Sequence, residues 1–340
     1  IIMINNSFFS TEILRWFREN GRDLPWRETK DPYAIWLSEI ILQQTRIAQG
    51  WEYWERFMKT YPKVEDLAAA SEDDVLKLWQ GLGYYSRARN LHTAARQIVE
   101  LGHFPDTLEG IKALKGVGDY TAAAIGSFAF DIPAAVVDGN VYRVLSRYFG
   151  IDTPINSTQG KKEFAALAQS LLPASDAASY NQGMMDFGAI QCTPQSPKCL
   201  VCPLAETCEA LRTGRVEELP VKNKTLKVKT RHLSYIYIRC KGEVAIHRRG
   251  EGDIWQGLWE PYNASDAPQL PAFVHNPLLL AKDVKHVLTH RIRLADFYLQ
   301  ETATRPLLPD DYIWVKEDEV EQYGVPRLIE IMLEMVQSKS

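Results

Sequence analysis

The chain has 340 residues, a formal net charge of −4, 46% hydrophobic residues and 24% charged residues. A chain of this length exceeds what one hydrophobic core usually serves, so we expect two domains. It contains no run of about 18 or more apolar residues, which excludes a membrane-spanning helix. Residues 1–17 lack the basic start and small-residue cleavage site of a secretory signal, so we expect a cytoplasmic protein, or a nuclear one in a eukaryotic cell.

The first two thirds of the chain have the pattern of helices. Apolar side chains recur at helical spacing through residues 8–215, and glycine or proline separates the segments. The sequence therefore predicts an all-α domain over residues 1–215. Its clearest helical segments are 33–47, 51–58, 73–79, 88–101, 120–129, 139–148, 161–172 and 179–190.

The pattern changes at about residue 216. Residues 216–231 are charged and lysine-rich without a usable period, which indicates a linker. Alternating, strand-like runs follow, and a helical stretch at 325–337 comes last. Strands with a helix predict a smaller α+β domain over residues 232–340. The expected strands are 233–239, 244–247, 284–288, 294–299 and 312–315.

Two glycines form a short turn between two helical segments. Gly116 and Gly118 flank Val117, and the helix expected over 120–129 follows at once. Glycine permits a tight turn and a close approach to a ligand, and the free N–H groups of the following helix suit a phosphate. The pattern alone is weak, because many such turns are only turns.

Four of the five cysteines lie close together in the sequence, at Cys192, Cys199, Cys202 and Cys208. In a reducing compartment such spacing indicates a metal site in preference to disulfides. Four thiolates can hold either a zinc ion or an iron–sulfur cluster, and spacing alone leaves both possible.

These features occur in an order that resembles a known protein family. The glycine hairpin, then residues 137–141 (VDGNV), then the cysteine cluster resemble the helix-hairpin-helix DNA glycosylases of the endonuclease III superfamily, over about residues 20–210. The resemblance implies two all-α lobes with the active site between them, a [4Fe–4S] cluster on the four cysteines, and double-stranded DNA as the partner of a monomer. Residues 1–231 have equal numbers of basic and acidic side chains, so the DNA-binding charge must be concentrated on one face.

Four longer segments narrow the resemblance. Residues 22–27, 37–45, 81–90 and 181–189 are similar to the adenine DNA glycosylases of the MutY type. That similarity implies base excision repair, in which adenine paired with 8-oxoguanine, or with G or C, is removed from double-stranded DNA.

The residues themselves suggest the chemistry. Hydrolysis of an N-glycosidic bond needs an acid for the leaving base and a carboxylate facing the sugar. Glu39 lies in an apolar helical frame, where burial would raise its pKa and keep it protonated. Asp138 precedes a helix, whose backbone N–H groups would keep it ionised. By resemblance, Glu39 protonates N7 of adenine. Asp138 stabilises the oxocarbenium ion.

Tyr120 argues for a monofunctional enzyme. Relatives that also cut the strand have a lysine at this point of the hairpin, and a phenol cannot form a Schiff base. We expect Tyr120 to hydrogen-bond the catalytic carboxylates and Asn140 to position Asp138.

The target base must leave the helical stack, so further residues must fill the gap and receive the base. By resemblance Gln44 and Tyr84 enter the duplex beside the lesion. The adenine pocket is expected to be lined by Arg22, Trp26, Arg27, Leu42 and Gln182.

The C-terminal segment Trp255–Glu260 resembles that family's Nudix-like domain. Residues 232–340 lack the Gly/Glu-rich box of a Nudix hydrolase, so we expect recognition of 8-oxoguanine without hydrolysis. The family reads the lesion with a Phe-Ser-His loop, and Leu288, Thr289 and His290 stand there in this chain. The loss of the aromatic residue bears on the strength of lesion selectivity.

Two other functions remain open from the sequence. One is a related glycosylase for T:G mispairs or oxidised pyrimidines, which the segment 43–45 and the C-terminal domain disfavour. The other is a non-catalytic module that scans DNA for damage, which the presence of both Glu39 and Asp138 disfavours.

Overall fold

The structure is a computed structural model that describes residues 6–223, 229–265, 271, 273–288 and 291–338. Its contacts divide the chain into two compact units, Ile1–Trp54 with Ala94–Lys224 and Glu55–Thr93 with Thr225–Ser340. Among the described helices, none has the length and apolar character that crossing a bilayer requires.

The first unit is helical, as the sequence predicts. Short 3₁₀ turns join its helices, and a π-helical turn, η2 (Phe187–Gln191), continues α11 toward the cysteines. Its α-helices are α1 (Asn6–Asn20), α2 (Pro32–Leu42), the greater part of α3 (Ile47–Thr60), the end of α6 (Ser86–Leu101), α7 (Leu108–Ala113), α8 (Asp119–Phe130), α9 (Gly139–Phe149), α10 (Thr158–Leu171), α11 (Ala177–Asp186) and α12 (Glu209–Arg212).

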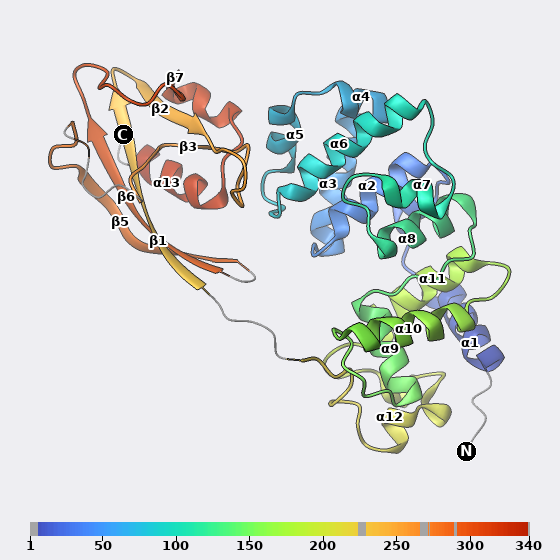
Figure 1. Cartoon of the computed structure of the whole chain (residues 1–340). Coiled ribbons are helices and arrows are strands. Elements are labelled where there is room, and N and C mark those ends of the chain that lie inside the picture. The colour runs from blue at the N-terminus through green and yellow to red at the C-terminus, as the bar shows by residue number, and fades with distance from the viewer. Residues whose placement is uncertain (1–5, 224–228, 266–270, 272, 289–290, 339–340) are drawn as a thin grey trace. The chain divides into compact units, whose positions relative to one another are not determined.

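Two clusters of buried side chains hold these helices together. In one, Phe9 of α1, Val144 of α9 and Phe164 of α10 pack together, and α1 also lies along α11 (Figure 1). In the other, Ile35 of α2 packs against α8, where the small residues Ala123 and Ala124 allow a close approach. Each fully buried large apolar side chain contributes about 1.5–3 kcal/mol.

Local sequence explains why α2 and α9 begin where they do. Pro32 occupies the first turn of α2, and the Asp31 side chain accepts a hydrogen bond from the N–H of Tyr33 at 3.0 Å. Asp138 caps α9 in the same way, through a 2.8 Å bond from the N–H of Val141. Both helices carry candidate site residues, so these caps fix where those residues lie.

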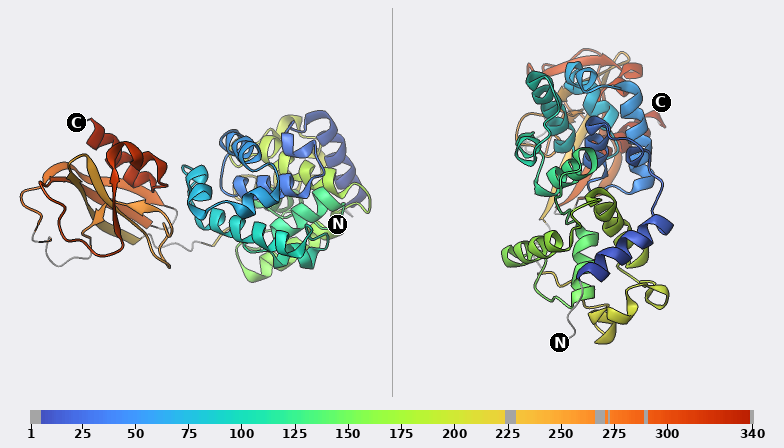
Figure 2. Two further views of the ribbon diagram at one scale, coloured as in Figure 1. Left: turned by 90° about the horizontal axis from the view of Figure 1, so that it is seen from above. Right: turned by 90° about the vertical axis from the view of Figure 1, so that its right-hand side faces the viewer.

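The second unit contains a mixed sheet of seven strands. The order along the sheet is β3-β2-β1-β6-β5, with β4 paired to β1 and β7 paired to β2, and β1 and β6 run parallel. Helix α13 (Arg327–Gln337) packs against β5 and β6, and the left view of Figure 2 shows it on one face of the sheet. The strands are β1 (Lys229–Cys240), β2 (Glu243–Arg248), β3 (Trp259–Glu260), β4 (Tyr262–Asn263), β5 (Leu278–Leu288), β6 (Arg291–Glu301) and β7 (Tyr312–Lys316).

This sheet and its helix confirm the predicted α+β class. All five expected strands are present, and β1 begins at Lys229, inside the segment expected as a linker. The two-residue strands β3 and β4 were not expected, because two residues are too few to show an alternation. Cys240, at the end of β1, is 2% exposed.

The second unit also contains α4 (Val64–Ala69), α5 (Glu72–Trp79) and the start of α6. Ser71 caps α5 by accepting a hydrogen bond from the N–H of Asp74, as its place before an acidic first turn suggests. The buried rings of Phe57 and Trp79 pack edge to face, which joins α3 to α5.

Candidate functional site

Glu39 and Tyr120 form the centre of the candidate site. Glu39 lies on α2 among residues that are all buried, and it is itself 6% exposed. The hydroxyl of Tyr120, in the first turn of α8, donates a 3.0 Å hydrogen bond to Oε2 of Glu39. Burial raises the pKa of Glu39 to about 7, although the bond from Tyr120 and the charge of Arg27 act in the opposite direction. A carboxyl group of this pKa can carry a proton near neutral pH.

Asp138 is held firmly at the start of α9. Its Oδ1 accepts the bond from the N–H of Val141, and its Oδ2 accepts a 2.8 Å bond from Nδ2 of Asn140. These N–H groups act to lower the pKa of Asp138, as expected for an N-cap, but burial outweighs them, so the pKa lies above its usual value. The charge of Asp138 also contributes to the raised pKa of Glu39, so the two carboxyl groups interact.

A small cavity opens beside Glu39, with a volume of about 50 Å³. The five side chains expected to form an adenine pocket all line it. This volume is far below the roughly 300–1,000 Å³ of ordinary ligand sites, so entry of a base requires side chains to move. The lining residues are Arg22, Leu24, Trp26, Arg27, Ile35, Glu39, Leu42, Ile47, Phe128, Gln182 and Met185.

Two of these lining side chains also pack in the hydrophobic core. Met185 is partly buried and packs against buried core side chains while it lines the cavity. Trp26 belongs to both, since it is 6% exposed, packs edge to face on Trp51 and Trp54, and still lines the cavity.

Asp186 is the functional candidate that the sequence did not reveal. It is fully buried at the end of α11 and accepts hydrogen bonds from both arginines of the cavity. Arg27 donates to its two oxygens at 2.8 and 2.9 Å, and Arg22 donates through Nε at 3.0 Å and through its backbone N–H at 2.9 Å. Although burial alone would raise the pKa of Asp186, these bonds lower it. The one available signal was an acidic residue between Met185 and Phe187 in a helical, apolar frame.

The glycine hairpin connects α7 to α8, and its two glycines differ. Gly116 has φ of 78°, which strongly favours glycine. Gly118 is the N-cap of α8 with an extended backbone, which any residue can adopt. A Cβ atom at Gly118 would meet no other atom within 4 Å, so the space in front of it is open.

Gln44 and Tyr84 share an unusual backbone conformation in their separate units. Gln44 follows α2 with φ of 58°, and Tyr84 precedes α6 with φ of 47°. Both side chains are exposed, Tyr84 by 45%. Left-handed backbone at residues other than glycine costs about 1–3 kcal/mol and is frequent at functional sites.

The four clustered cysteines line one small cavity together with Arg147. Burial, and then repulsion among the thiolates, raises the pKa of Cys202 to about 11, and burial also raises the pKa of Cys199 and Cys208. A bound metal cation would favour loss of these protons. Nη1 of Arg147 also donates a hydrogen bond to Sγ of Cys192 at 3.4 Å. The residues therefore fit a metal–sulfur centre. In the described residues no group of three or more Cys, His, Asp or Glu is arranged to hold a single metal ion.

Helix α9 links this loop to Asp138. Arg143, which is 8% exposed, donates from Nε to the carbonyl of Cys192 at 2.8 Å and from Nη2 to Oδ1 of Asn140 at 2.7 Å. One turn later, Arg147 donates to the carbonyl of Thr193 at 2.7 Å. Through Arg143 the orientation of Asn140, and so of Asp138, depends on the shape of the cysteine loop.

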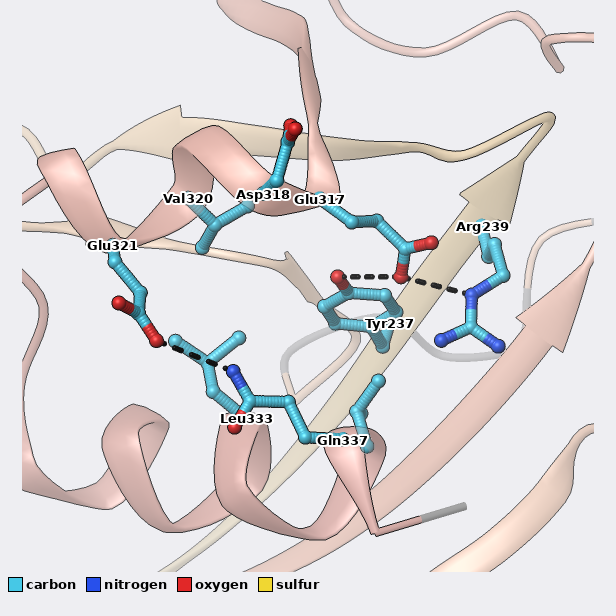
Figure 3. Close-up of a pocket in the computed structure, with 9 residues that line it drawn as sticks. Tyr237, Arg239, Glu317, Asp318, Val320, Glu321, Leu333 and Gln337 are labelled. Carbon is cyan, nitrogen blue, oxygen red and sulfur yellow. Dashed lines mark hydrogen bonds and ion pairs between the residues drawn. The ribbon is translucent and has the colours of Figure 1, made fainter. Parts of the chain in front are cut away.

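A third cavity, of about 330 Å³, lies between β1 and α13 (Figure 3). Three of its polar groups are bonded together, with the hydroxyl of Tyr237 and Nε of Arg239 both donating to Oε1 of Glu317 at 2.9 and 2.8 Å. The expected lesion-reading residues Thr289 and His290 lie outside the described residues, and Leu288 ends β5.

Three family models match the chain. Residues 37–173 match the HhH-GPD superfamily of base excision DNA repair proteins, and residues 234–335 match the NUDIX domain. Residues 192–208 match the iron–sulfur binding domain of endonuclease III. The loop therefore binds a [4Fe–4S] cluster, which excludes the zinc alternative.

Solved structures agree with this fold. A thermostable thymine-DNA glycosylase is 34% identical, covers 61% of this chain and 97% of its own, and has a TM-score of 0.57. An endonuclease III–DNA covalent intermediate covers 62% of this chain and 99% of its own with a TM-score of 0.54, and at 22% identity it supports the fold alone.

Curated relatives give the enzyme class. The adenine DNA glycosylase of Buchnera aphidicola (subsp. Acyrthosiphon pisum, strain APS) is 32% identical over 96% of this chain and 97% of its own length. The adenine DNA glycosylase of Mus musculus is 43% identical over 62% of this chain, which spans 44% of the mouse protein. The chain thus belongs to the adenine DNA glycosylases, enzymes of base excision repair in DNA.

Proposed function

We propose that this enzyme removes adenine paired with 8-oxoguanine from double-stranded DNA, and more weakly adenine paired with G or C, without cutting the strand. The observation that carries the proposal is a buried carboxyl group with a pKa of about 7, Glu39, beside a cavity and coupled to a second carboxyl, Asp138. Glu39 suits the role of the general acid, and Asp138 suits the role of the carboxylate that faces the sugar.

In the proposed reaction Glu39 donates its proton to N7 of the departing adenine. Asp138 stays ionised, stabilises the positive charge that develops on the sugar, and assists the incoming water. The 3.0 Å bond from Tyr120 orients Glu39, and the 2.8 Å bond from Asn140 orients Asp138. No lysine occupies the hairpin position of Tyr120, so no imine with the sugar is expected.

Adenine would enter the cavity beside Glu39 after leaving the duplex. Arg22 and Arg27 are held by Asp186, so their guanidinium groups form a fixed polar wall. Trp26 and Leu42 offer apolar surface, and Gln182 offers an amide that can bond the base edge. Gln44 and Tyr84 are proposed to fill the vacated space, for which their exposed, left-handed turns suit them.

The glycine hairpin is proposed to bind the DNA backbone. The open space in front of Gly118 and the free N–H groups of the first turn of α8 suit a phosphate.

We further propose that the catalytic domain covers residues 1–215, with a linker at 216–231. The 232–340 domain would read 8-oxoguanine through Thr289 and His290, on a protein that acts as a monomer.

Single-turnover excision tests this proposal. Duplexes carrying A opposite 8-oxoguanine, A opposite G, A opposite C, T opposite G and A opposite T are treated with and without alkali. Fast base loss from the 8-oxoguanine duplex, with strand breaks that appear only after alkali, is expected. Strand breaks without alkali, or trapping of the protein on DNA by borohydride, contradict the monofunctional mechanism. Equal rates opposite 8-oxoguanine and guanine contradict lesion reading.

Two variants separate chemistry from binding. Glu39→Gln and Asp138→Asn should each lower the excision rate by at least about 10²-fold, as removal of a general acid or a charge-stabilising group does. Binding of the 8-oxoguanine duplex should change little. A Glu39→Gln variant as active as wild type would instead support a module that only binds DNA.

A further inference from the structure

Arg293 is a buried arginine that makes no hydrogen bond or ion pair with the described residues. It lies near the start of β6, is 6% exposed, and its Nε has no hydrogen-bond partner. No residue that the structure describes forms an ion pair with its guanidinium group. Arginine is almost never fully buried unless it is paired, because an unpaired buried charge loses several kcal/mol of hydration.

The side chains around Arg293 increase its positive potential. Arg231 of β1 pairs with Arg293 across the parallel strands, and His286 of β5 pairs with it on the other side, so the three side chains share one face of the sheet. Arg291 lies two residues before it on that same face. Burial, and then repulsion from Arg231 and Arg291, lower the pKa of Arg293.

The carboxylate that acts on Arg293 is already bonded elsewhere. Asp253 accepts a 2.9 Å bond from Nε of Arg249 and a 2.7 Å bond from the N–H of Trp255. Its charge favours the ionised form of Arg293, but no hydrogen bond joins the two. Arg293 is therefore charged and partly desolvated, and no described carboxylate bonds it directly.

We propose that Arg293, with Arg231 and Arg291 at its rim, binds a phosphate of the DNA strand that carries the 8-oxoguanine. A guanidinium fork suits two phosphate oxygens, and an incoming phosphate would supply the missing counter-charge. DNA is favoured by the sequence, because Arg293 follows the residues proposed to read the lesion, Thr289 and His290, by three positions. The choice of that strand rests on the proposed function, in which this domain reads the 8-oxoguanine.

The free phosphates of a nucleotide have the same chemistry, so the test must separate the two sources. Binding is measured on the full chain with a duplex in which 8-oxoguanine faces 2′-fluoro-2′-deoxyadenosine, which resists hydrolysis, between about 50 and 200 mM KCl. Arg293→Met should reduce the slope of log Kd against log salt by about 0.9, the value for one phosphate contact. Arg293→Lys should keep the slope.

Arg305→Met is the matched control, since it removes one positive charge from an exposed pair with Glu243 in the same domain. Its slope should equal that of wild type. Arg293→Met should also unfold at the same or a higher temperature, because it removes an unpaired buried charge. An unchanged slope for Arg293→Met, or a marked loss of stability, overturns the proposal and leaves Arg293 a structural residue.

Two further results would also overturn it. The first is a lost preference for 8-oxoguanine over guanine with an unchanged slope, which indicates a base contact. The second is stabilisation of wild type, but not Arg293→Met, by free 8-oxo-dGTP, which indicates a nucleotide site. Failure of the proposed function is seen separately, as absence of adenine excision by wild type, and leaves the slope measurement valid.

Discussion

Tyr120 of α8 and Glu39 of α2 are joined by a hydrogen bond of 3.0 Å, in which the phenol donates and the carboxyl accepts. The bond favours the ionised carboxylate and so opposes burial, which raises the pKa; with both effects present the pKa of Glu39 is about 7. A general acid is most effective when its pKa lies near the working pH, and this pair of residues sets that value.

The pH dependence of excision follows from this pair. The single-turnover rate should fall above about pH 7, by about tenfold per pH unit, as Glu39 loses its proton. Tyr120→Phe removes a bond that lowers the pKa of Glu39, so the fall should begin at higher pH. Rates measured between about pH 5 and pH 9 check both statements. A wild-type profile that is flat across pH 7 would exclude Glu39 as the acid.

The stability of the protein should also depend on the ionisation of Glu39. A carboxyl with a raised folded pKa stabilises the fold when protonated, and this stability is lost as the pH rises from about 4.5 to about 7. Glu39→Gln cannot ionise. At pH 8 it should therefore be more stable than wild type by an amount on the order of 3 kcal/mol, and at low pH it should not. Urea unfolding at the two pH values measures the difference. Equal differences at both would show that Glu39 is not buried in solution.

The pairing of Asp186 with two arginines predicts a large effect of its removal. Asp186→Asn leaves Arg22 and Arg27 without their counter-charge, which should cost about 3–5 kcal/mol of unfolding free energy. Glu209→Gln is the control, because it breaks an exposed, solvent-screened pair with Arg212 and should leave the unfolding free energy nearly unchanged. Similar losses in the two variants would mean that the Asp186 cluster is solvated in solution.

The two hairpin glycines should respond differently to alanine. Gly116→Ala places a Cβ on left-handed backbone and should lower the unfolding free energy by about 1–2 kcal/mol. Gly118→Ala has extended backbone and open space, so stability should be kept while DNA binding weakens. Thermal unfolding and Kd for duplex DNA are the measurements. Unchanged DNA affinity in Gly118→Ala would remove this turn from the interface.

Loss of one cluster cysteine should affect bound iron and excision together. Cys202→Ser should lose iron and slow excision, because the loop no longer supports Arg143 and Asn140. Cys240→Ala changes a buried thiol at the end of β1 and should keep its iron. Iron content and single-turnover rates check both variants. Full activity in an iron-free Cys202→Ser protein would show that Asn140 does not depend on the loop.

Most of the fold was predictable because its signals are local. Helical periodicity predicted the main helices, and the alternation in residues 294–299 predicted the long strand β6. The short strands β3 and β4 could not be predicted, since only pairing with distant strands makes them strands.

The candidate site shows the same difference between what local sequence predicts and what depends on distant residues. The burial of Glu39 follows from its apolar neighbours on α2, but the raised pKa of Asp138 does not follow from its N-cap position. That rise depends on tertiary burial, which a helix start cannot reveal. Asp186 was missed because its two partners lie about 160 residues earlier in the chain, at separations of 164 and 159.

The small volume of the cavity beside Glu39 has a consequence for inhibitor design. A free purine finds too little room there, so screening base-sized compounds against the protein alone should yield no competitive inhibitor. The space for a base must be opened by a nucleotide held in a duplex. An effective inhibitor of this enzyme would therefore be an oligonucleotide that carries a non-cleavable adenosine mimic.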